Sequence, residues 1–406
     1  MKEEIREGLL EEYARLIVRM GINLQKDQLL VINAPFASGA YDAGAHDVTV
    51  VWNDELLARL RYDKAKKSVF TEFPEWRRLL YQDSAEQGAA FVTIHASDPE
   101  IFSGVEPERL TLAQQAAGAA LLEYRARLMS NKNAWCVVSI PTESWAKKVF
   151  PEETPAVALE KLWQAIFDAV RLAADEDAAA RWQEHIDFLA RAATFMNDHA
   201  FKRLEYKNSL GTNLSIELPR GHIWAGGAEK TQAGVTFVAN MPTEEIYTLP
   251  KRDGVNGTVV ATRPLNVNGT IVDGFSLTFK AGKVVDYKAA RGEEILKELF
   301  ATDEGASYLG EVALVPYDSP ISRSGVLFFN TLFDENAACH LAFGKAYPTC
   351  IEGGEEMTSV ELLRHGVNDS LVHEDFMIGS RDLSIDGIAE DGTRVAVFRD
   401  GNFAFV

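Results

Sequence analysis

The chain has 406 residues, of which 47% are hydrophobic and 25% are charged, a composition typical of a folded protein rather than a disordered one. Its 60 Asp and Glu residues outnumber its 41 Lys and Arg residues, and the formal net charge of −19 disfavours binding to nucleic acid or to an anionic membrane. The same balance is compatible with cationic ligands such as divalent metals or a free ammonium group.

The first half of the chain alternates short apolar runs with helical patterns. The runs predict strands at residues 29–32, 48–52, 90–94 and 135–140, and the patterns predict helices at about 54–61, 75–87 and 107–129. Apolar strands separated by helices are typical of a parallel sheet that helices cover on both faces. Only residues 36–47 separate the first two strands, too few for a comfortable crossover helix. Either these strands are not neighbours or the chain lacks that helix.

The second half has a different sequence pattern. Helical patterns at about 155–174 and 177–196 lead into alternating segments at 214–218, 235–238 and 258–261. Asn-Gly pairs at 256–257 and 268–269 predict turns, and the second of these, like Asp-Gly at 391–392, stands between two such runs and predicts a hairpin. We therefore expect an α/β N-terminal domain with a mainly parallel sheet at residues 1–185, followed by a strand-rich α+β domain at 186–406.

Several motifs of catalysis and targeting are missing from the sequence. It contains no phosphate-binding loop, no dinucleotide-binding glycine motif after a strand and no Gly-x-Ser-x-Gly elbow. The N-terminus has no apolar signal segment, and no window approaches about 18 consecutive apolar residues, so we expect neither secretion nor a membrane span. The three cysteines form no Cys-x-x-Cys pair and fit a reducing cytoplasm.

Histidines and carboxylates gather near the C-terminus. If the run around His373 is extended, His373 and Asp375 share one face and Glu374 points away. An imidazole beside a carboxylate can ligate a divalent metal, although such a pair is more often a surface ion pair. Met377 stands where a zincin helix needs its second histidine. His340 lies in a small, apolar run and needs a polar partner, of which a metal is one.

Two further carboxylate segments are ambiguous by themselves. Glu311 opens an apolar strand at 310–316, and Glu244 and Glu245 follow the exit of another strand. Each of these segments alone favours a solvated strand end or a surface pair. The histidines outside the C-terminal stretch, in turn, favour surface or partly buried imidazoles.

Taken together, these segments resemble the thermophilic-type metalloaminopeptidases, the family of aminopeptidases T and S. The matching segments are 241–245, 309–316, 336–344, 346–348, 352–354 and 368–379, with looser similarity at 145–151 and 33–35. The resemblance thus covers most of the chain. It implies that two divalent metal ions are held by five ligands, with Tyr347 beside them: Glu245, Glu311, His340, His373 and Asp375.

The resemblance also implies an activity. The chain is expected to be a cytoplasmic hydrolase, an aminopeptidase that removes the N-terminal residue of peptides with a preference for apolar residues such as Leu, and to form a homodimer. Three carboxylates and two imidazoles suit Zn²⁺, Co²⁺ or Mn²⁺. Glu311 or Asp375 is expected to bridge the metals, Tyr347 to donate a hydrogen bond to the oxyanion or only to shape the site, and Glu244 to be a candidate proton shuttle.

Two alternatives stay open at this point. The same ligands would serve another two-metal amidohydrolase or a phosphoesterase, although phosphoesters usually need added Arg or Lys, and the matching segments offer only Lys345. A metal-free peptide-binding protein on the same fold is the second alternative. Members of the family have a helix where this chain has only residues 36–47, so the chain departs from the family pattern at this joint of the N-terminal sheet.

Overall fold

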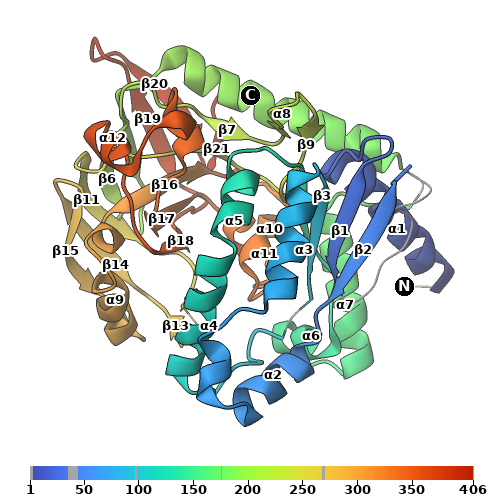
Figure 1. Cartoon of the computed structure of the whole chain (residues 1–406). Coiled ribbons are helices and arrows are strands. Elements are labelled where there is room, and N and C mark those ends of the chain that lie inside the picture. The colour runs from blue at the N-terminus through green and yellow to red at the C-terminus, as the bar shows by residue number, and fades with distance from the viewer. Residues whose placement is uncertain (1–2, 35–43, 97, 175, 268–269, 406) are drawn as a thin grey trace. The chain divides into compact units, whose positions relative to one another are not determined.

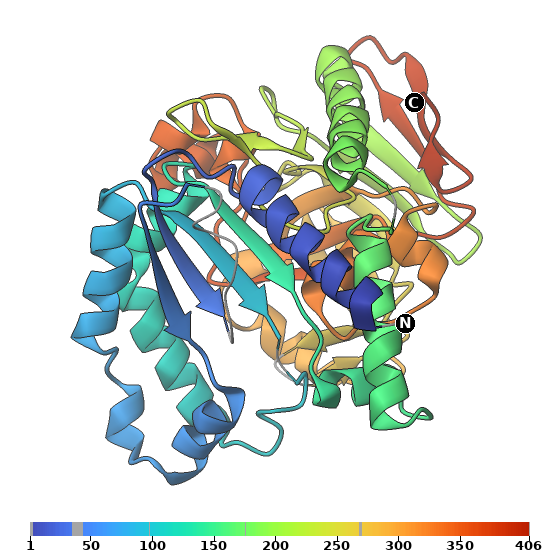
Figure 2. The ribbon, with the colours of Figure 1, turned by 90° about the vertical axis from the view of Figure 1, so that its right-hand side faces the viewer.

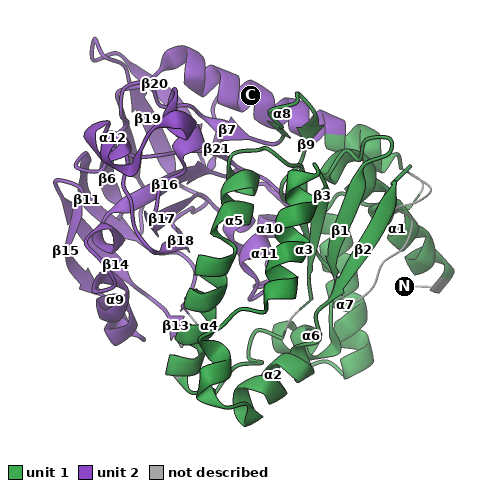
Figure 3. Cartoon of the chain, viewed as in Figure 1, with its two compact units in different colours: residues 1–182, 228–242 green, residues 183–227, 243–406 purple. Residues whose placement is uncertain are grey.

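A computed structural model describes residues 3–34, 44–96, 98–174, 176–267 and 270–405 (Figure 1). The chain forms two compact units, one of residues 1–182 and 228–242 and the other of residues 183–227 and 243–406 (Figure 3). The expected domain boundary at 185/186 stays a prediction. The return of residues 228–242 to the first unit was not predicted from the sequence.

The first unit contains the four-stranded parallel sheet that the sequence predicts. Its strands are β1 (Leu29–Ala34), β2 (Asp47–Trp52), β3 (Ala90–His95) and β4 (Trp135–Ser139), in the order β2-β1-β3-β4. Since β1 and β2 pair directly, the reading that they are not neighbours is wrong. Most of their connection lies outside the described residues, so the lack of a crossover helix stays a prediction.

Helices cover both faces of this sheet, as Figure 2 shows. On one face lies α1 (Glu3–Leu16), from which the Tyr13 hydroxyl donates to the carbonyl of Ser139 at the end of β4, 3.3 Å away. On the other face α3 (Glu75–Glu86) and α5 (Leu122–Met129) pack against Val31, Val51 and Phe91. The helix predicted at 107–129 is two helices, α4 (Pro107–Ala120) and α5.

The remaining elements of the first unit are short or flank the sheet. They are α2 (Glu55–Lys64), α6 (Glu143–Val149), α7 (Pro155–Ala169) and the two-residue strands β8 (Glu229–Lys230) and β9 (Thr236–Phe237). The division between the units falls inside α8 (Ala178–His199). No helix of the described residues is long and apolar enough to cross a membrane.

The second unit is built on two antiparallel sheets. The larger has the order β15-β14-β11-β6-β5-β19-β20-β21, with bounds Lys283–Lys288, Ser276–Lys280, Val255–Val260, Asn213–Glu217, Arg203–Lys207, Ser384–Ile388, Arg394–Arg399 and Asn402–Phe403. The smaller has the order β18-β17-β16-β10-β7, with bounds His373–Met377, His340–Gly344, Leu309–Leu314, Ile246–Thr248 and Ala225–Gly226. These strands confirm the predicted strand-rich region.

Short elements complete this unit. Strands β12 (Leu265–Val267) and β13 (Thr270–Val272) pair with each other in an antiparallel ribbon. The helices are α9 (Glu293–Phe300), α10 (Pro320–Ser324), α11 (Thr331–Asp334), which continues into the single 3₁₀ turn η5 (Glu335–Ala337), and α12 (Ser359–Arg364).

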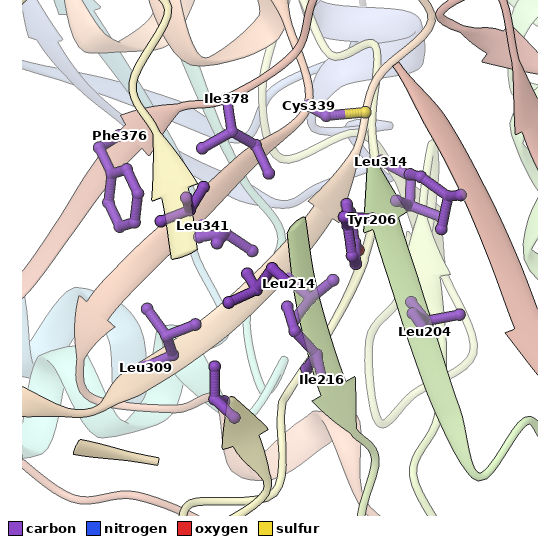
Figure 4. Close-up of a cluster of buried hydrophobic side chains, with 14 of the residues drawn as sticks. Leu204, Tyr206, Leu214, Ile216, Leu309, Leu314, Cys339, Leu341, Phe376 and Ile378 are labelled. Carbon is purple, nitrogen blue, oxygen red and sulfur yellow. The ribbon is translucent and has the colours of Figure 1, made fainter. Parts of the chain in front are cut away.

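The two sheets share one apolar core (Figure 4). The larger sheet contributes Leu204, Tyr206, Leu214 and Ile216, and the smaller contributes Leu309, Leu314, Leu341, Phe376 and Ile378. Successive residues of a strand point to opposite faces. A register irregularity between Leu309 and Glu311 interrupts this alternation on β16. From Glu311 onward, the residues that alternate with the core side chains of β16, β17 and β18 therefore lie on the far face of the smaller sheet, away from the core.

The turn predictions had mixed outcomes. Asp391 and Gly392 join the paired strands β19 and β20, as predicted. The turn at Asn256-Gly257 is wrong, because both residues lie inside β11. Gly257 has a φ of +117°, and a Cβ there would lie 2.2 Å from the carbonyl oxygen of Asn213, so this glycine allows a close backbone approach. The pair at 268–269 lies outside the described residues, although the strands that flank it do pair.

Candidate metal centre

The far face of the smaller sheet carries a row of side chains that includes two carboxylates. In the strand register, Glu311 of β16 pairs with Ala342 of β17, and Ala342 pairs with Asp375 of β18. The methyl group of Ala342 thus lies between two carboxylates and leaves room above it. His340 and His373 each lie two residues before a member of this row and so project from the same face.

The structure brings all five ligands that the resemblance implied into one place. Their potential ligand atoms form two groups, each within 4.8 Å: Glu245, Glu311 and His340 in one, and Glu311, His373 and Asp375 in the other. Glu245 reaches the site from the residue directly before β10. Glu311 belongs to both groups, so the two groups share one carboxylate.

Glu311 faces the two imidazoles with different oxygens. Its Oε1 lies 3.6 Å from Nε2 of His340, and its Oε2 lies 3.5 Å from Nε2 of His373. Glu245 Oε2 approaches His340 Nε2 to 3.1 Å, and Asp375 Oδ1 lies 3.6 Å from His373 Nε2. A carboxylate that presents one oxygen to each side has the arrangement needed to bridge two cations.

Both imidazoles are oriented through their other nitrogen. Nδ1 of His373 donates to the carbonyl of Lys345 at 2.7 Å, and Nδ1 of His340 donates to the carbonyl of Ala338 at 3.2 Å. A carbonyl oxygen can only accept, so each Nδ1 carries the proton when these hydrogen bonds form. In the neutral ring Nε2 then presents its lone pair to the carboxylates, as in a metal-ligating histidine.

These five side chains form a cluster that carries more negative charge than the cationic groups around it balance. Burial raises the pKa of Glu311, and repulsion from Asp375 and Glu245 adds to this rise while His340 opposes it. Burial by itself disfavours the charged form of His340, yet the neighbouring carboxylates of Glu245 and Glu311 hold its pKa well above the usual value. The same competition between burial and the carboxylates Asp375 and Glu311 raises the pKa of His373.

Two buried carboxylate oxygens, Glu245 Oε2 and Asp375 Oδ1, make no hydrogen bond within the described part of the chain. Leaving buried acceptors unsatisfied is costly, and a cation is the partner that would satisfy both. In the described ion pairs the three carboxylates of the cluster meet only the two imidazoles. The donor set, its orientation and its charge therefore fit divalent metal ions.

The site is closed on one side and accessible on the other. The side chains of His340 and Glu311 are 1% and 6% exposed, whereas those of His373 and Asp375 are 24% and 13% exposed. A ligand would therefore approach from the side of β18. The Tyr347 ring lies on this side, with its centroid 5.0 Å from that of His373. Burial and the neighbouring carboxylates raise the pKa of Tyr347 well above its usual value, so its hydroxyl is a hydrogen-bond donor.

A fourth carboxylate, Glu335, was missed in the sequence analysis. It begins η5 directly after α11 and lines a cavity together with His373 and Asp375. Burial raises the pKa of Glu335 well above its usual value, and repulsion from Asp375 and Glu245 raises it further. Its sequence context, between an aspartate and an asparagine, looks like an ordinary helix end. Only the packing of η5 against β18 reveals its place.

Other residues considered from the sequence lie elsewhere. Glu244 is buried, but it belongs to neither ligand group, and its Oε2 is 3.7 Å from Nε2 of His185. His365 is exposed at the end of α12. Asn336 begins the matching segment 336–344. Its side chain accepts from the backbone N–H of Glu244 at 2.7 Å and so ties the segment of Glu245 to that of Glu335.

Known proteins resemble this chain over nearly its whole length. A model of the thermophilic metalloprotease family (M29) matches residues 6–403. Aminopeptidase 2 of Geobacillus stearothermophilus is 50% identical over 405 residues, and aminopeptidase AmpS of Bacillus subtilis (strain 168) is 47% identical over 405, each alignment covering 98% of both chains. The solved structure of wild-type AmpT from Thermus thermophilus superimposes with a TM-score of 0.91 at 39% identity and covers 98% of this chain and 99% of that one.

Proposed function

This chain belongs to the thermophilic metalloprotease family (M29) and is a metalloaminopeptidase, and on that premise we propose that it holds two divalent metal ions. Glu245 and His340 would hold one ion, His373 and Asp375 would hold the other, and Glu311, which belongs to both groups, would serve both. The proposal draws its main support from one observation: the two oxygens of Glu311 face two different imidazoles, at 3.6 and 3.5 Å. Zn²⁺ is the first candidate, with Co²⁺ or Mn²⁺ as alternatives.

When bound, a pair of such ions lowers the pKa of a shared water towards about 7 and polarises a carbonyl group. The protein contributes position and proton transfer. The Tyr347 hydroxyl donates a hydrogen bond to the oxygen of the scissile carbonyl as it becomes an oxyanion. The Glu335 carboxylate takes the proton of the attacking water and passes it to the leaving amine. This assignment replaces Glu244 as the proton shuttle, because Glu335 lines the cavity beside His373 and Asp375.

The substrates are peptides with a free N-terminus, and we propose a preference for apolar N-terminal residues such as Leu. The excess of carboxylates over cationic side chains in the cluster suits a substrate that brings its own ammonium group. We further propose that the enzyme works in the cytoplasm as a homodimer. The buried cysteines Cys136, Cys339 and Cys350 form no disulfide and are consistent with a reducing compartment.

Metal analysis and a pair of substrates test the proposal. Protein purified without chelator should carry close to two equivalents of divalent metal, and chelation followed by Zn²⁺ or Co²⁺ should remove and restore hydrolysis of leucine p-nitroanilide. A protein that hydrolyses p-nitrophenyl phosphate instead would be a phosphoesterase. A protein with neither metal nor activity after metal addition would be a peptide-binding protein on the same fold.

A further inference from the structure

A cavity of about 310 Å³ opens directly beside the proposed metal centre, within the second unit. At one end it is lined by Glu335, His373 and Asp375. Its walls are formed by the ribbon of β12 and β13, by the loop that precedes α11, and by the edge strand β18. Of these elements, β13 and β18 are labelled in Figure 1. This volume lies at the lower end of the range of about 300–1,000 Å³ for small-molecule pockets, so the cavity suits a single residue rather than a length of peptide.

The walls away from the proposed ligands carry apolar side chains beside the polar Asn330, Thr331 and Asp334. Leu265 and Ile271 contribute from the ribbon, Leu327 and Phe329 from the loop, and Met377 from the end of β18. Among the described residues that line the cavity there is no Lys or Arg, whereas Asp334 and Glu374 line it in addition to Glu335. Apolar walls interrupted by carboxylates, with no cationic side chain among the described lining residues, favour an apolar occupant over an acidic one.

Phe329 is held in an uncommon backbone conformation. Its φ of +55° lies in the left-handed region, which a bulky side chain rarely adopts. The two residues that flank it are fixed by one buried carboxylate: Asp334 Oδ1 accepts from the N–H of Phe328 at 2.8 Å, and Oδ2 accepts from the N–H of Asn330 at 3.0 Å. Such strain persists where the surroundings over-determine it, commonly at ligand sites.

The same carboxylate connects the loop to the chemistry. Asp334 is the residue before Glu335, and Asn330 caps α11 by accepting from the N–H of Leu332 at 3.1 Å. The loop, α11 and η5 therefore form one hydrogen-bonded segment that carries Phe329 at one end and Glu335 at the other. The position of the aromatic wall is fixed relative to the reacting groups, as a specificity pocket requires.

We propose that this cavity receives the side chain of the substrate's N-terminal residue and that Phe329, from the loop, and Ile271, from the ribbon, set its size. The inference rests on the proposed aminopeptidase function, because only then does a substrate place its first side chain next to the scissile bond. Leu and Met side chains cover more of the apolar walls than Ala does, and Glu or Asp meets Glu374.

Two variants act on the pocket in opposite senses. Phe329→Ala removes one wall, so kcat/KM for leucine p-nitroanilide should fall about 10-fold or more while that for alanine p-nitroanilide changes by less than about 3-fold, in line with the known effect of changing a few methylenes in a pocket. Ile271→Trp places a larger side chain in the chamber, so it should leave alanine p-nitroanilide as a substrate and reject the leucine compound. Leu371→Ala is the control, because Leu371 is 86% exposed and does not line the cavity.

Inhibition by free amino acids gives a readout that is independent of turnover. L-leucine should inhibit the wild type more strongly than L-alanine, and Phe329→Ala should remove that difference while metal content stays unchanged. If both variants retain metal and lower hydrolysis of the leucine and alanine compounds by the same factor, the cavity is not the side-chain pocket. A preference for lysine p-nitroanilide that is lost in Glu374→Gln would also overturn the apolar assignment. If the metal-loaded wild type hydrolyses no aminoacyl anilide, the proposed function itself fails.

Discussion

The two sheets of the second unit shift the pKa values of their carboxyl groups in opposite directions. On the larger sheet, Glu205 and Asp386 accept hydrogen bonds from Arg394 at 2.6 and 2.7 Å, and Asp386 also pairs with Arg399. Partial burial works against the charged forms, but these arginines lower the pKa of both carboxyl groups. On the smaller sheet, burial and mutual repulsion raise the pKa of Glu311.

This difference separates a structural ion-pair network from a ligand site within one fold. Carboxylates that are paired with arginines favour the folded state without any bound ion. Carboxylates gathered without such partners oppose folding until a cation arrives, and native proteins keep such arrangements mainly where function requires them. The contrast also gives the two sheets opposite responses to pH.

The most direct test of this difference between the sheets is to neutralise one carboxylate on each of them. Glu311→Gln should lower peptidase activity by at least about 10²-fold, since contributions of this type are commonly that large. The chelated variant should be no less stable than the chelated wild type, because the substitution removes a buried, repelled charge. Asp386→Asn is the matched control and should keep full activity. Retained activity in Glu311→Gln would remove Glu311 from the mechanism.

Tyr347→Phe tests the donor at the same site without altering charge. Activity should fall by about 10- to 100-fold, at or below the effect of removing one oxyanion-hole donor, because the hydroxyl is lost and the ring remains. Metal content should not change, and the loss should lie in kcat rather than in KM. A variant with wild-type kcat would leave Tyr347 as a residue that only shapes the site.

In the metal-free protein, the carboxyl groups of the ligand site should make stability depend on pH with the opposite sign to that of an ordinary ion-paired carboxylate. Because the folded state raises the pKa of Glu311 and Glu335 above the ordinary 4.5, it holds protons that the unfolded chain releases, and its stability falls as pH rises. The raised pKa of His340 acts in the same direction above its ordinary 6.5. The melting temperature of the chelated protein should therefore drop between about pH 5 and about pH 8, and metal should reduce the drop. A melting temperature that rises over this range in chelator would contradict the account.

A smaller effect is expected on the larger sheet. The lowered pKa of Asp386 means that its stabilisation is present above the ordinary value of 3.8 and is lost as pH falls through the folded-state pKa. Asp386 and Arg394 are partly exposed, so Asp386→Asn should cost about 0.2–1 kcal/mol at neutral pH by denaturant unfolding. The difference from wild type should vanish in acid. A cost that persists there would mean that packing, rather than charge, is lost.

The smallest expected effect is that of His365→Ala. His365 is exposed and lies outside both ligand groups, although it falls between His340 and His373 in the sequence. Activity and metal content should match those of the wild type within error. A strong loss of either would show that the set of ligands is incomplete.

Sequence patterns predicted the scaffold better than they predicted the site. The strands of the parallel sheet lie within two residues of their predicted positions, because continuous apolar runs leave few alternatives. Two-residue spacing also placed His373 and Asp375 on one face. The other three proposed ligands came from family resemblance, because no local pattern links residues on separate strands.

What the sequence could not reveal depended on packing between distant segments. Glu335 reaches the cluster only because η5 packs against β18, and nothing in its neighbourhood distinguishes it from a helix end. Ala342 looked like one small residue among several, and its value lies in the register that sets it between Glu311 and Asp375. The break between α4 and α5 at Leu121 follows Gly118 by three residues, and a single glycine inside a helical pattern does not by itself predict a break.

Anomalous scattering from crystals of the protein, measured at the absorption edge of the bound metal, tests the central claim most directly because it reports element, number and ligands together. The account predicts two peaks on the far face of the smaller sheet, one bounded by Glu245, Glu311 and His340 and the other by Glu311, His373 and Asp375. A single peak, or metal bound away from Glu311 in active protein, would contradict it.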